Sequence, residues 1–590
     1  MLGALYDIRT DSIIPEWLWD GSVIEKNARK KALPTTVSQI VVGSAFSSKA
    51  NAFHLSPDTT ANFLGGLVKV HGAGSYLQTD SSSNHQAEVA FKYHSRTHYQ
   101  ELDMTTVHKV EYPDQLENLM ATHVVSGIEY GVDAVFKFDK QLSNVSDCSK
   151  VEGELSDAVT FAFGSVAKLN LTEKQEANYS HIRCTFMGDV KLPHSPTNFL
   201  DAIDIFKILP SLVSERSAVP LTVYLLPMSE FDSKGQRTVY NIDLKLLISV
   251  QKRMEELNQL ERTIGDLKFT NVYSLFKLYN QQVDNFGHAV AARQLHFQLA
   301  LFLILPAVRN GSMVESTLAS ILNESDAMKT LLDWVKQKNN EAVALNTMLS
   351  WDPSQTVMSQ KDFKALLFNY DVRYVISFTL SLYQSQDWFT ACVLYQCRQK
   401  QNEGDPCNQL NCKGNYSWLE DHTFVHLLRS QFHNFQQLLQ ANRAAGMGKT
   451  AMVIREDLNP SSSSVPAVKF EIFDNGQLVD QYETTQIPAV QDIAAELGYN
   501  CSILIKWTMT SSQFFGKWMD SLTVKYRGDS RQDYVSVDVT LTDQFQVTIP
   551  FYSKLEVVVQ ANCAFGICAV RRKAFNGFEK EECTTHSKCS

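Results

Sequence analysis

The sequence feature that most constrains the fold is an alternation of apolar and polar side chains over residues 121–139, ATHVVSGIEYGVDAVFKFD. The even-numbered side is mostly apolar from Val124 to Phe138, whereas the odd-numbered side carries charged residues such as Asp133 and Lys137. A repeat of two residues is typical of a β-strand. These nineteen residues, at about 3.3 Å each, would extend for about 60 Å, whereas most strands have about 5–6 residues. The sequence therefore predicts a sheet with unusually long strands.

Two glycines, Gly127 and Gly131, lie on the polar side of this alternation. A missing side chain permits a bend in a strand or a close approach of another backbone. Residues 85–99, HQAEVAFKYHSRTHY, repeat the alternation and predict a second long strand, with His94 and His98 on a solvated polar face. We therefore expect a long sheet that bends near the two glycines.

The composition is that of ordinary globular protein, and 590 residues are too many for one core. The net charge of −10 gives no basic footprint, so we expect no nucleic-acid partner. No apolar run approaches the roughly 20 residues of a membrane-spanning helix. The nearest run, LALFLILPAV at residues 299–308, contains Pro306 and predicts the buried end of a helix.

The chain changes character after the long strands. Apolar residues from Val250 to Leu267 recur at intervals of three and four, and the pattern predicts an all-helical region of about a hundred residues. Residues 359–458 mix strand and helix patterns and predict a small α/β unit. Residues 459–466, NPSSSSVP, have the composition of a linker. From residue 467 onward a hairpin, AVKFEIFDNGQLVDQY, and further short strands predict a β-sandwich.

Eight of the eleven cysteines fall into two groups and are candidates for disulfides. The group near the C-terminus fits two disulfides and an oxidising compartment. The other group is open to disulfides, free thiols or zinc, although its spacing lacks the tight C-x2-C knuckle. We expect a secreted protein, although no conventional signal peptide is visible in this sequence, and the alternative is a cytoplasmic one. The two groups are Cys392, Cys397, Cys407 and Cys412, and Cys563, Cys568, Cys583 and Cys589.

Motifs for catalysis are missing from the sequence. GMGKT at residues 446–450 resembles the end of a phosphate-binding loop, but Arg443 stands where the pattern needs a glycine. The sequence contains no H-E-x-x-H, G-x-S-x-G or Rossmann fingerprint. We expect no enzymatic activity, no cofactor and no metal site.

Two segments near the long strands also alternate. Residues 157–172, DAVTFAFGSVAKLNLT, do so after an acidic stretch that predicts a helix, and part of residues 45–85 shows a looser version. About 9–11 alternating residues are enough to cross a bilayer within a closed barrel. Each segment could be a packed cluster in one state and a membrane hairpin in another, and the alternative is an ordinary edge strand or core helix. The candidate membrane-inserting residues are Leu64, Val68, Val70, Tyr76, Val159, Phe161, Phe163, Ala167, Leu169 and Leu171.

Four separated motifs carry a resemblance to a known family. They are LGALYDIRTDSIIPEW, FLGGLVKVHGAGSYL, ATHVVSGIEYGVDAVFKFD and SAVPLTVYLLPMSEF. In this order, over residues 2–458, they resemble the stonustoxin family of fish venom cytolysins and their relatives, a branch of the perforin and cholesterol-dependent-cytolysin superfamily. The resemblance implies a bent central sheet flanked by two helical clusters, at residues 45–85 and 144–171. Gly127 and Gly131 match the glycines expected at the bend.

The resemblance also implies a multidomain α+β fold. The family toxins end in a PRY-SPRY domain, but the last region of this chain looks like a fibronectin type III module. Trp507 and Tyr526 occupy core positions of that module, and Leu555 stands where it usually has a tyrosine. The expected domains are a perforin/cytolysin-like domain at 1–250, a helical domain resembling a focal-adhesion-targeting bundle at 251–352, a thioredoxin-like domain without redox cysteines at 353–458, and a fibronectin type III-like β-sandwich with a cysteine-rich tail at 467–590.

The function implied by the resemblance is that of a pore-forming or perforin-like protein. Such a protein oligomerises on membranes and inserts two β-hairpins per subunit, which unfurl from the helical clusters. Its partners would be a membrane lipid or surface receptor, and further copies of itself or a homologous subunit. The alternative is a non-lytic scaffold or binding protein that retains the fold.

Overall fold

The computed structural model divides the described part of the chain into two compact units. Unit 1 comprises Met1–Phe269 and Val283–Lys336, and unit 2 comprises Thr270–Gln282 and the described residues from 337 onward. The structure describes residues 1–576 except 82, 106–109, 118–119, 144–146, 165–178, 180, 232–236, 323–324, 352–356, 385–416, 447, 460–464, 484–489, 499–501, 511–516, 529–532 and 540–545.

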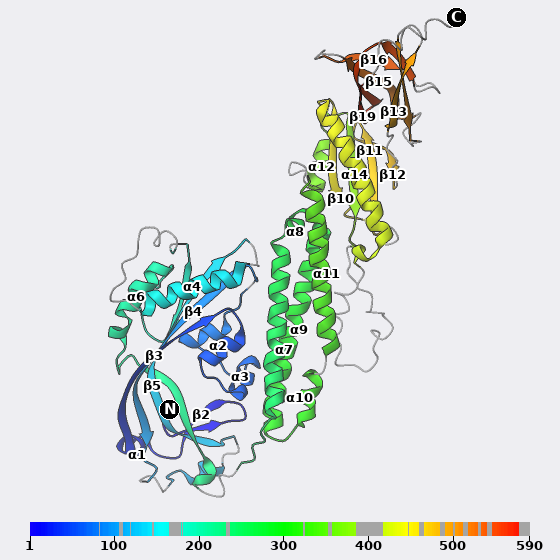
Figure 1. The fold of residues 1–590 in the computed structure, drawn as a ribbon. Coiled ribbons are helices and arrows are strands. Elements are labelled where there is room, and N and C mark those ends of the chain that lie inside the picture. Colours follow the sequence, from blue (N-terminus) through cyan, green and yellow to red (C-terminus); the bar gives the residue numbers. More distant parts are fainter. Residues whose placement is uncertain are drawn as a thin grey trace, which may run out of the picture. The chain divides into compact units, whose positions relative to one another are not determined.

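Unit 1 is built on a seven-stranded antiparallel sheet, in the order β2-β1-β5-β4-β3, with β6 and β7 also paired to β5 (Figure 1). The predicted long strands are confirmed, because β5 has 19 residues and β4 has 17. The strands are β1 (Ala4–Asp7), β2 (Ser12–Trp17), β3 (Ala28–Val42), β4 (Gln86–Leu102), β5 (His123–Gln141), β6 (Arg183–Gly188) and β7 (Val219–Pro227).

Helices cover both faces of the sheet at one end. The even-numbered face, with Phe136 and Phe138, forms a core with α4 and α6. The odd-numbered face, with Val135, packs against α2 and the short 3-10 helix η1. Both faces are therefore buried there, although the alternation had predicted a solvated polar side. The helices are α1 (Gly21–Asn27), α2 (Phe46–Ala52), α3 (Pro57–Leu64), η1 (Gly72–Gln78), α4 (Cys148–Gly164) and α6 (Phe199–Leu212).

Long helices follow the sheet, as the change of period predicted. Leu247, Val250, Met254 and Leu257 recur on the buried side of α7, which begins at the cap residue Asp243. The expectation that residues 299–308 are buried is correct for one side only, because Leu299 and Leu303 are exposed. The helices are α7 (Leu244–Lys268), α8 (Asn271–Leu275), α9 (Lys277–Arg309), α10 (Glu315–Leu322) and α11 (Ser325–Leu349).

The α/β part of unit 2 has a five-stranded sheet in the order β12-β11-β9-β10-β8. β10 is parallel to β8 and β9, β11 is antiparallel to β9, and β12 is antiparallel to β11, which is a thioredoxin-like arrangement. Asn475 and Gly476, both with positive φ, turn the predicted hairpin. The elements are β8 (Val357–Met358), α12 (Gln360–Leu367), β9 (Tyr374–Ser381), α14 (His422–Ala444), β10 (Thr450–Glu456), β11 (Ala467–Asp474) and β12 (Gln477–Tyr482).

This sheet corrects the boundary predicted at residues 458–467. The hairpin of β11 and β12 completes the α/β sheet, because eight residues of β11 pair with β9, and it does not begin the β-sandwich. The hairpin motif identifies two paired strands from local sequence alone. The edge on which they add depends on backbone donors and acceptors left open by β9, which is distant in sequence.

The β-sandwich begins at β13. Two antiparallel sheets, β13-β14-β17 and β16-β15-β18-β19, form the predicted β-sandwich. Trp507, Tyr526 and Leu555 are buried, as their predicted core positions require. The strands are β13 (Val490–Gly498), β14 (Ser502–Met509), β15 (Met519–Gly528), β16 (Val535–Val539), β17 (Gln546–Pro550), β18 (Lys554–Cys563) and β19 (Gly566–Asn576).

A buried carboxylate in unit 2 leads to a prediction about pH. Glu456, at the end of β10, accepts hydrogen bonds from the Lys277 and Leu278 amides at the start of α9, at 2.6 and 3.1 Å. Burial raises the pKa of Glu456 from 4.5 to about 7. Because the folded state holds this proton more tightly than the unfolded state, the free energy of unfolding should fall as the pH rises from 4.5 to 7.

We predict that Glu456→Gln flattens this dependence, as measured by urea unfolding at pH 5 and 7.5. Glu496→Gln is the control, since Glu496 is exposed and pairs with Lys506 at the surface. An unchanged slope in Glu456→Gln would contradict the prediction.

Candidate membrane-inserting clusters

The α4 helix occupies part of the second cluster and anchors it through Phe163. A helical repeat places Val159 and Phe163 on one face, and their exposed fractions are 0% and 6%. Phe163 contacts an aromatic core whose nearest rings are Phe91 and Phe206, with centroid distances of 4.6 and 4.8 Å. Burying each such side chain stabilises the packed state by about 1.5–3 kcal/mol.

Phe161 lies between these two residues but points away from the core. Its side chain is 52% exposed, and its neighbour Thr160 is also exposed. The sequence alternation places Phe161 on the same side as Val159 and Phe163, whereas the helix separates it from them. Ala167, Leu169 and Leu171 lie outside the described residues. The segment thus has the sequence pattern of a strand and, up to Gly164, the structure of a helix.

The first cluster, which we define as α2, α3 and η1, lies on the opposite face of the sheet. Ser56 caps α3 by accepting a hydrogen bond from the Thr59 amide. Of the predicted inserting residues, Tyr76 is fully buried, Leu64 is 6% exposed, and Val68 and Val70 are half-buried. Tyr76 packs in the core on the odd-numbered face of β5, whereas Leu64 and Val68 line a cavity together with residues of α7 and α9. Val159 and Phe163 lie in the separate core on the other face of the sheet.

A layer of buried charges lies between the first cluster and the sheet. Glu88 on β4 is fully buried, and both Lys49 on α2 and Lys137 on β5 reach it, at 3.4 and 3.2 Å. Lys49 also donates hydrogen bonds to the carbonyl and hydroxyl oxygens of Thr79, at 2.5 and 2.9 Å. One carboxylate therefore serves two ammonium groups from different elements.

A second charged group continues this layer toward the bend of the sheet. Asp133 on β5 lies 3.4 Å from Lys92 and 2.6 Å from Nδ1 of His94, both on β4. Lys92 donates to the carbonyl oxygen of Ala52 in α2 at 3.0 Å and lies over the Phe53 ring. His94 is thus within hydrogen-bond distance of Asp133 and is half-buried, so the expectation that it is merely solvated is wrong.

His98 was also expected to be solvated, and this expectation is wrong as well. It is 8% exposed and stacks on the Tyr130 ring with a centroid distance of 4.7 Å. The hydroxyl of the preceding residue, Thr97, lies 2.9 Å from His98 Nδ1.

Burial lowers the pKa of the Lys49 and Lys92 ammonium groups in this layer. It raises the pKa of two neighbouring carboxyls, those of Asp80, which attracts Lys49, and of Asp189, which accepts a hydrogen bond from the Asp133 amide at 3.2 Å. Each charge has lost much of its hydration, and its partners offset this cost only while the layer is complete. Removing one partner of a buried pair therefore costs more than removing a surface pair.

The long helices restrain the first cluster from its other side. Asp266 on α7 accepts hydrogen bonds from Ser83 and Asn84, which follow the cluster in the chain, at 2.6–2.8 Å. Arg309 on α9 pairs with Asp58 on α3 at 3.0 Å. A cavity of about 340 Å³ lies between this part of the chain and the two helices, where Leu64 and Val68 face Met254 of α7 and Gln298 of α9. Any movement of the first cluster must break these contacts as well as the charged layer.

The sheet is irregular along a line that crosses three strands. In β4, Arg96 pairs with Gly131 and His98 pairs with Tyr130 of β5. Thr97, between them, has no partner residue in β5 and forms a β-bulge. Its hydroxyl donates to the Tyr130 carbonyl at 3.1 Å. The pairing of β3 shifts at the same level, next to Pro34. Gly131 is needed here because a Cβ would overlap the Ser95 carbonyl oxygen.

Gly127 is needed for a different reason. A Cβ at this position would overlap the phenol of Tyr99, whose ring lies across Gly127 and packs edge-on against Tyr224. The obstacle at Gly127 is thus a side chain, whereas the obstacle at Gly131 is backbone.

This difference predicts the outcome of a double-mutant cycle. Gly127→Ala should lower the free energy of unfolding by about 1–3 kcal/mol through overpacking. Combined with Tyr99→Ala it should cost less than the sum of the two single changes. Gly131→Ala is the control, because truncating Tyr99 does not move the Ser95 carbonyl. Additive effects at Gly127, measured by urea unfolding, would contradict this account.

The charged layer predicts an order of destabilisation. Glu88→Gln leaves two buried lysines without their shared carboxylate and should cost about 3–5 kcal/mol. Lys49→Met should cost less, because Lys137 still neutralises Glu88. Glu215→Gln, which removes an exposed pair with Lys30, should leave the stability nearly unchanged, because water and salt screen surface pairs. Urea unfolding of the three variants measures the order, and a larger loss in Lys49→Met than in Glu88→Gln would exclude it.

The candidates for metal ligands and disulfides do not belong to the two clusters. Among the described residues, no group of three or more His, Cys, Asp or Glu side chains could hold a metal ion. Cys563 and Cys568 form a disulfide that joins the end of β18 to the start of β19. The other candidate cysteines, Cys392, Cys397, Cys407, Cys412, Cys583 and Cys589, lie outside the described residues.

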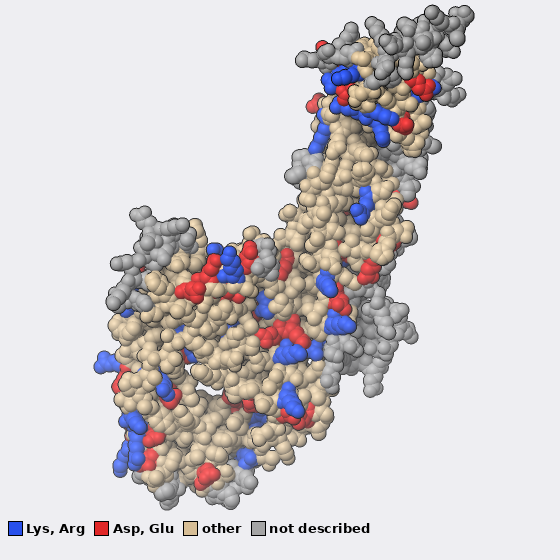
Figure 2. All heavy atoms as spheres, in the orientation of Figure 1, with Lys and Arg blue, Asp and Glu red and all other residues tan. Residues whose placement is uncertain are grey.

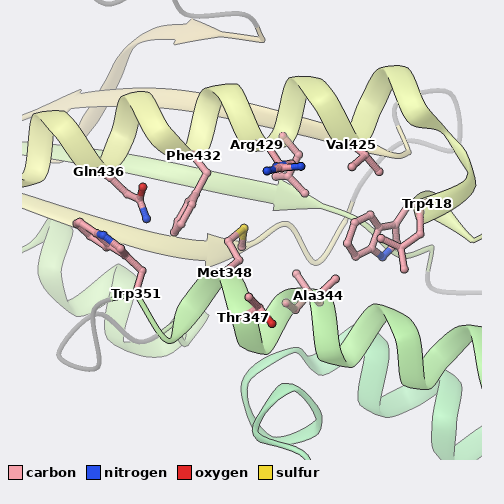
Figure 3. A pocket seen from close by; sticks show the side chains of 12 residues that line it. Ala344, Thr347, Met348, Trp351, Trp418, Val425, Arg429, Phe432 and Gln436 are labelled. Carbon is pink, nitrogen blue, oxygen red and sulfur yellow. The ribbon is translucent and has the colours of Figure 1, made fainter.

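Unit 2 contains a groove of about 520 Å³ between the end of α11 and α14. Trp351 and Trp418 lie at its two ends, Met348 and Phe432 line its middle, and Arg429 lies along the α14 side (Figure 3). This size is within the range of small-molecule sites. None of the residues predicted from the sequence lines the groove.

The sequence pattern identified the two clusters but missed the charged layer. Its signal was present, since Glu88, Lys92, Asp133 and Lys137 lie on the inward side of two alternating strands. Opposite charges at neighbouring positions of paired strands indicate an ion-pair layer once the register is known. The register could not be read from either strand alone.

A long, bent antiparallel sheet with a helical cluster on each face defines the fold of the perforin and cholesterol-dependent-cytolysin class. Comparisons with known proteins agree with this class. The family model "SNTX, MACPF/CDC-like domain" matches residues 1–179, and the model "Stonustoxin helical domain" matches residues 252–343. Residues 1–179 and 252–343 are therefore similar to the MACPF/CDC-like domain and the helical domain of stonustoxin, which confirms the resemblance found in the sequence.

Individual relatives extend this result. Verrucotoxin subunit beta of Synanceia verrucosa is 30% identical over 332 residues, which are 55% of this chain and 47% of the relative. Cytolytic toxin-beta of Scorpaena plumieri is 24% identical over 521 residues, covering 85% and 72%. A stonustoxin structure covers 98% of this chain and 95% of its own, with 16% identity and a TM-score of 0.64, which shows a shared fold. The chain spans about half the length of verrucotoxin subunit beta.

Proposed function

We propose that this chain is a pore-forming protein that assembles on membranes and inserts hairpins derived from its two clusters. The observation that carries the proposal is the conflict at α4, where a segment with the alternation of a barrel strand is folded as a helix. Within that helix Phe161 is exposed, although its place in the alternation is on the apolar side. Exposure of a large aromatic ring has no use in the packed cluster, whereas a barrel strand would turn it toward lipid.

The first cluster would supply the second hairpin. Leu64, Val68, Val70 and Tyr76 would become its lipid-facing side after the cluster leaves the charged layer. The sheet residues Glu88, Lys92, Asp133 and Lys137 would then regain water, which offsets the loss of their partners. Bulges and Gly131 at the bend give the sheet a place to change its curvature.

The proposal includes an assembly partner and a cellular location. The relatives are named toxins and subunits, and we infer that a homologous chain or a second copy takes part in assembly. The Cys563–Cys568 disulfide supports secretion into an oxidising compartment. On the face of the molecule in Figure 2, Lys and Arg are interspersed with Asp and Glu, so this face offers no broad cationic field for anionic lipids.

Dye release from liposomes of phosphatidylcholine and cholesterol tests the function directly. Leakage together with ring-shaped oligomers in negative-stain images is the expected result. Tight binding to a protein partner without leakage from any vesicle would favour the non-lytic scaffold instead.

The structure also selects the substitution that isolates insertion from folding. Phe163→Lys would unfold the soluble cluster, whereas Phe161→Lys changes an exposed residue and should leave that cluster intact. In the membrane Phe161 would face lipid near mid-bilayer, where a lysine costs about 2–4 kcal/mol. We therefore predict normal thermal unfolding and normal vesicle binding for Phe161→Lys but greatly reduced dye release.

Thr160→Lys is the matched control, because Thr160 is exposed in the helix and would face the lumen of a barrel. It should release dye at a rate close to that of the wild type. Equal leakage by both variants would show that residues 157–172 do not enter the bilayer as an alternating strand.

A further inference from the structure

The outward face of α9 changes from polar to apolar along the helix. Asn285 and His288 are exposed on this face in the first half. In the second half four large apolar side chains take their place, and we call them the α9 stripe. Their exposed fractions are 56% for Leu295, 53% for Leu299, 47% for Phe302 and 65% for Leu303.

The opposite side of the same turns is already used for packing. Phe297, Leu301, Ile304 and Leu305 are between 0% and 7% exposed. A helix that is apolar on all sides is normally buried on all sides. The α9 helix is long and apolar enough to meet the length and hydropathy criteria for a membrane span. Only 33% of its most apolar stretch of 18 residues is buried. Within the part of the chain that the structure describes, the α9 stripe is left uncovered.

The charge pattern around the stripe indicates what covers it. The exposed positions of this face from residue 285 to residue 303 include no Lys, Arg, Asp or Glu. Asp284, at the edge of the face, is paired with Lys268 at 2.7 Å. A helix that lies on a lipid surface carries Lys and Arg at the exposed positions of its polar side. The exposed positions of α9 between residues 285 and 303 carry neither. When a surface meets its own copy across a two-fold axis, any charge near that axis meets its like, so an uncharged face suits self-pairing.

We infer that the α9 stripe is the contact through which two copies of this chain pair, with Leu299 and Phe302 near the two-fold axis. The contact would be the assembly surface of the proposed pore-forming protein. Its role in assembly rests on the proposed function, whereas the pairing itself does not. The stripe extends over nine residues, or about 13 Å of helix. Four side chains over this length bury less surface than the roughly 800 Å² per partner of a standard interface, which involves about 20–30 residues on each side. The pair therefore forms at high protein concentration and dissociates on dilution.

Sedimentation velocity over a concentration series tests the pairing. The average mass of the wild type should rise from one copy toward two. Leu299→Glu and Leu303→Glu should each weaken the association at least about thirtyfold, since a central apolar contact is replaced by a charge that meets its own copy. Asn285→Glu, on the same face but in its polar half, is the control and should associate like the wild type. Thermal unfolding of each variant verifies that the exposed substitutions leave the fold intact.

Photocrosslinking identifies the occupant. With a benzophenone amino acid in place of Phe302 and a mixture of isotopically light and heavy chains, we expect crosslinks between chains that map to residues 295–303. Crosslinks only within one chain would show that another segment of the same chain covers the stripe and would overturn the inference. Monomeric wild type at all concentrations, or loss of binding to phosphatidylcholine–cholesterol vesicles by monomeric Leu299→Glu, would overturn it too.

The same samples separate this inference from the proposed function. Dye release without pairing through α9 would refute the contact and leave the pore-forming function standing. Pairing without dye release would support the contact and refute the function.

Discussion

Glu88 lies at the centre of a layer in which two lysines from different elements reach one buried carboxylate. Lys49 arrives from α2 and Lys137 from β5, and none of the three retains appreciable contact with water. The first cluster can pack on the sheet only where β4 and β5 pair in the register that brings these charges together. The position of the cluster, and with it the contacts that α7 and α9 make, depends on this layer.

The two faces of the sheet hold their clusters by different physical means. On the even-numbered face, α4 is held by aromatic contacts around Phe163, and each contact adds a modest amount of stabilisation. On the odd-numbered face, the contacts are charged and desolvated, so the loss of one partner exposes the desolvation cost of the others. The hydrogen bonds that Asp266 accepts from Ser83 and Asn84, and the Arg309–Asp58 pair, further restrain the first cluster. Within unit 1 the two clusters therefore depend on separate sets of contacts.

The same helices that restrain the first cluster also present the uncovered stripe. The α9 helix uses Leu301 and its neighbours for packing and leaves Leu299 and Leu303 outside. One helix thus connects the cluster proposed to insert and the surface proposed to pair. Pairing of two copies and release of the first cluster would both involve contacts of α9. The helical repeat of α9 determines which side chains face the core and which face outward.

The sequence by itself determined the long strands, the change to helical period after residue 250, the mixed α/β pattern that follows it, the strands of the β-sandwich and the resemblance to the stonustoxin family. These features are local, because a repeat of two or of 3.6 residues follows from backbone geometry within one segment. What covers each face of a strand is not local. The alternation in β5 could not show that Asp133 and Lys137 lie beneath a helix, that His94 is within hydrogen-bond distance of Asp133, or that α4 is helical where its sequence alternates. Only the tertiary structure decided these points, and also the addition of β11 to β9 and the exposure of the α9 stripe. Strand register, ion pairing and burial depend on contacts between residues far apart in the chain, and their free energy is not encoded in either partner alone.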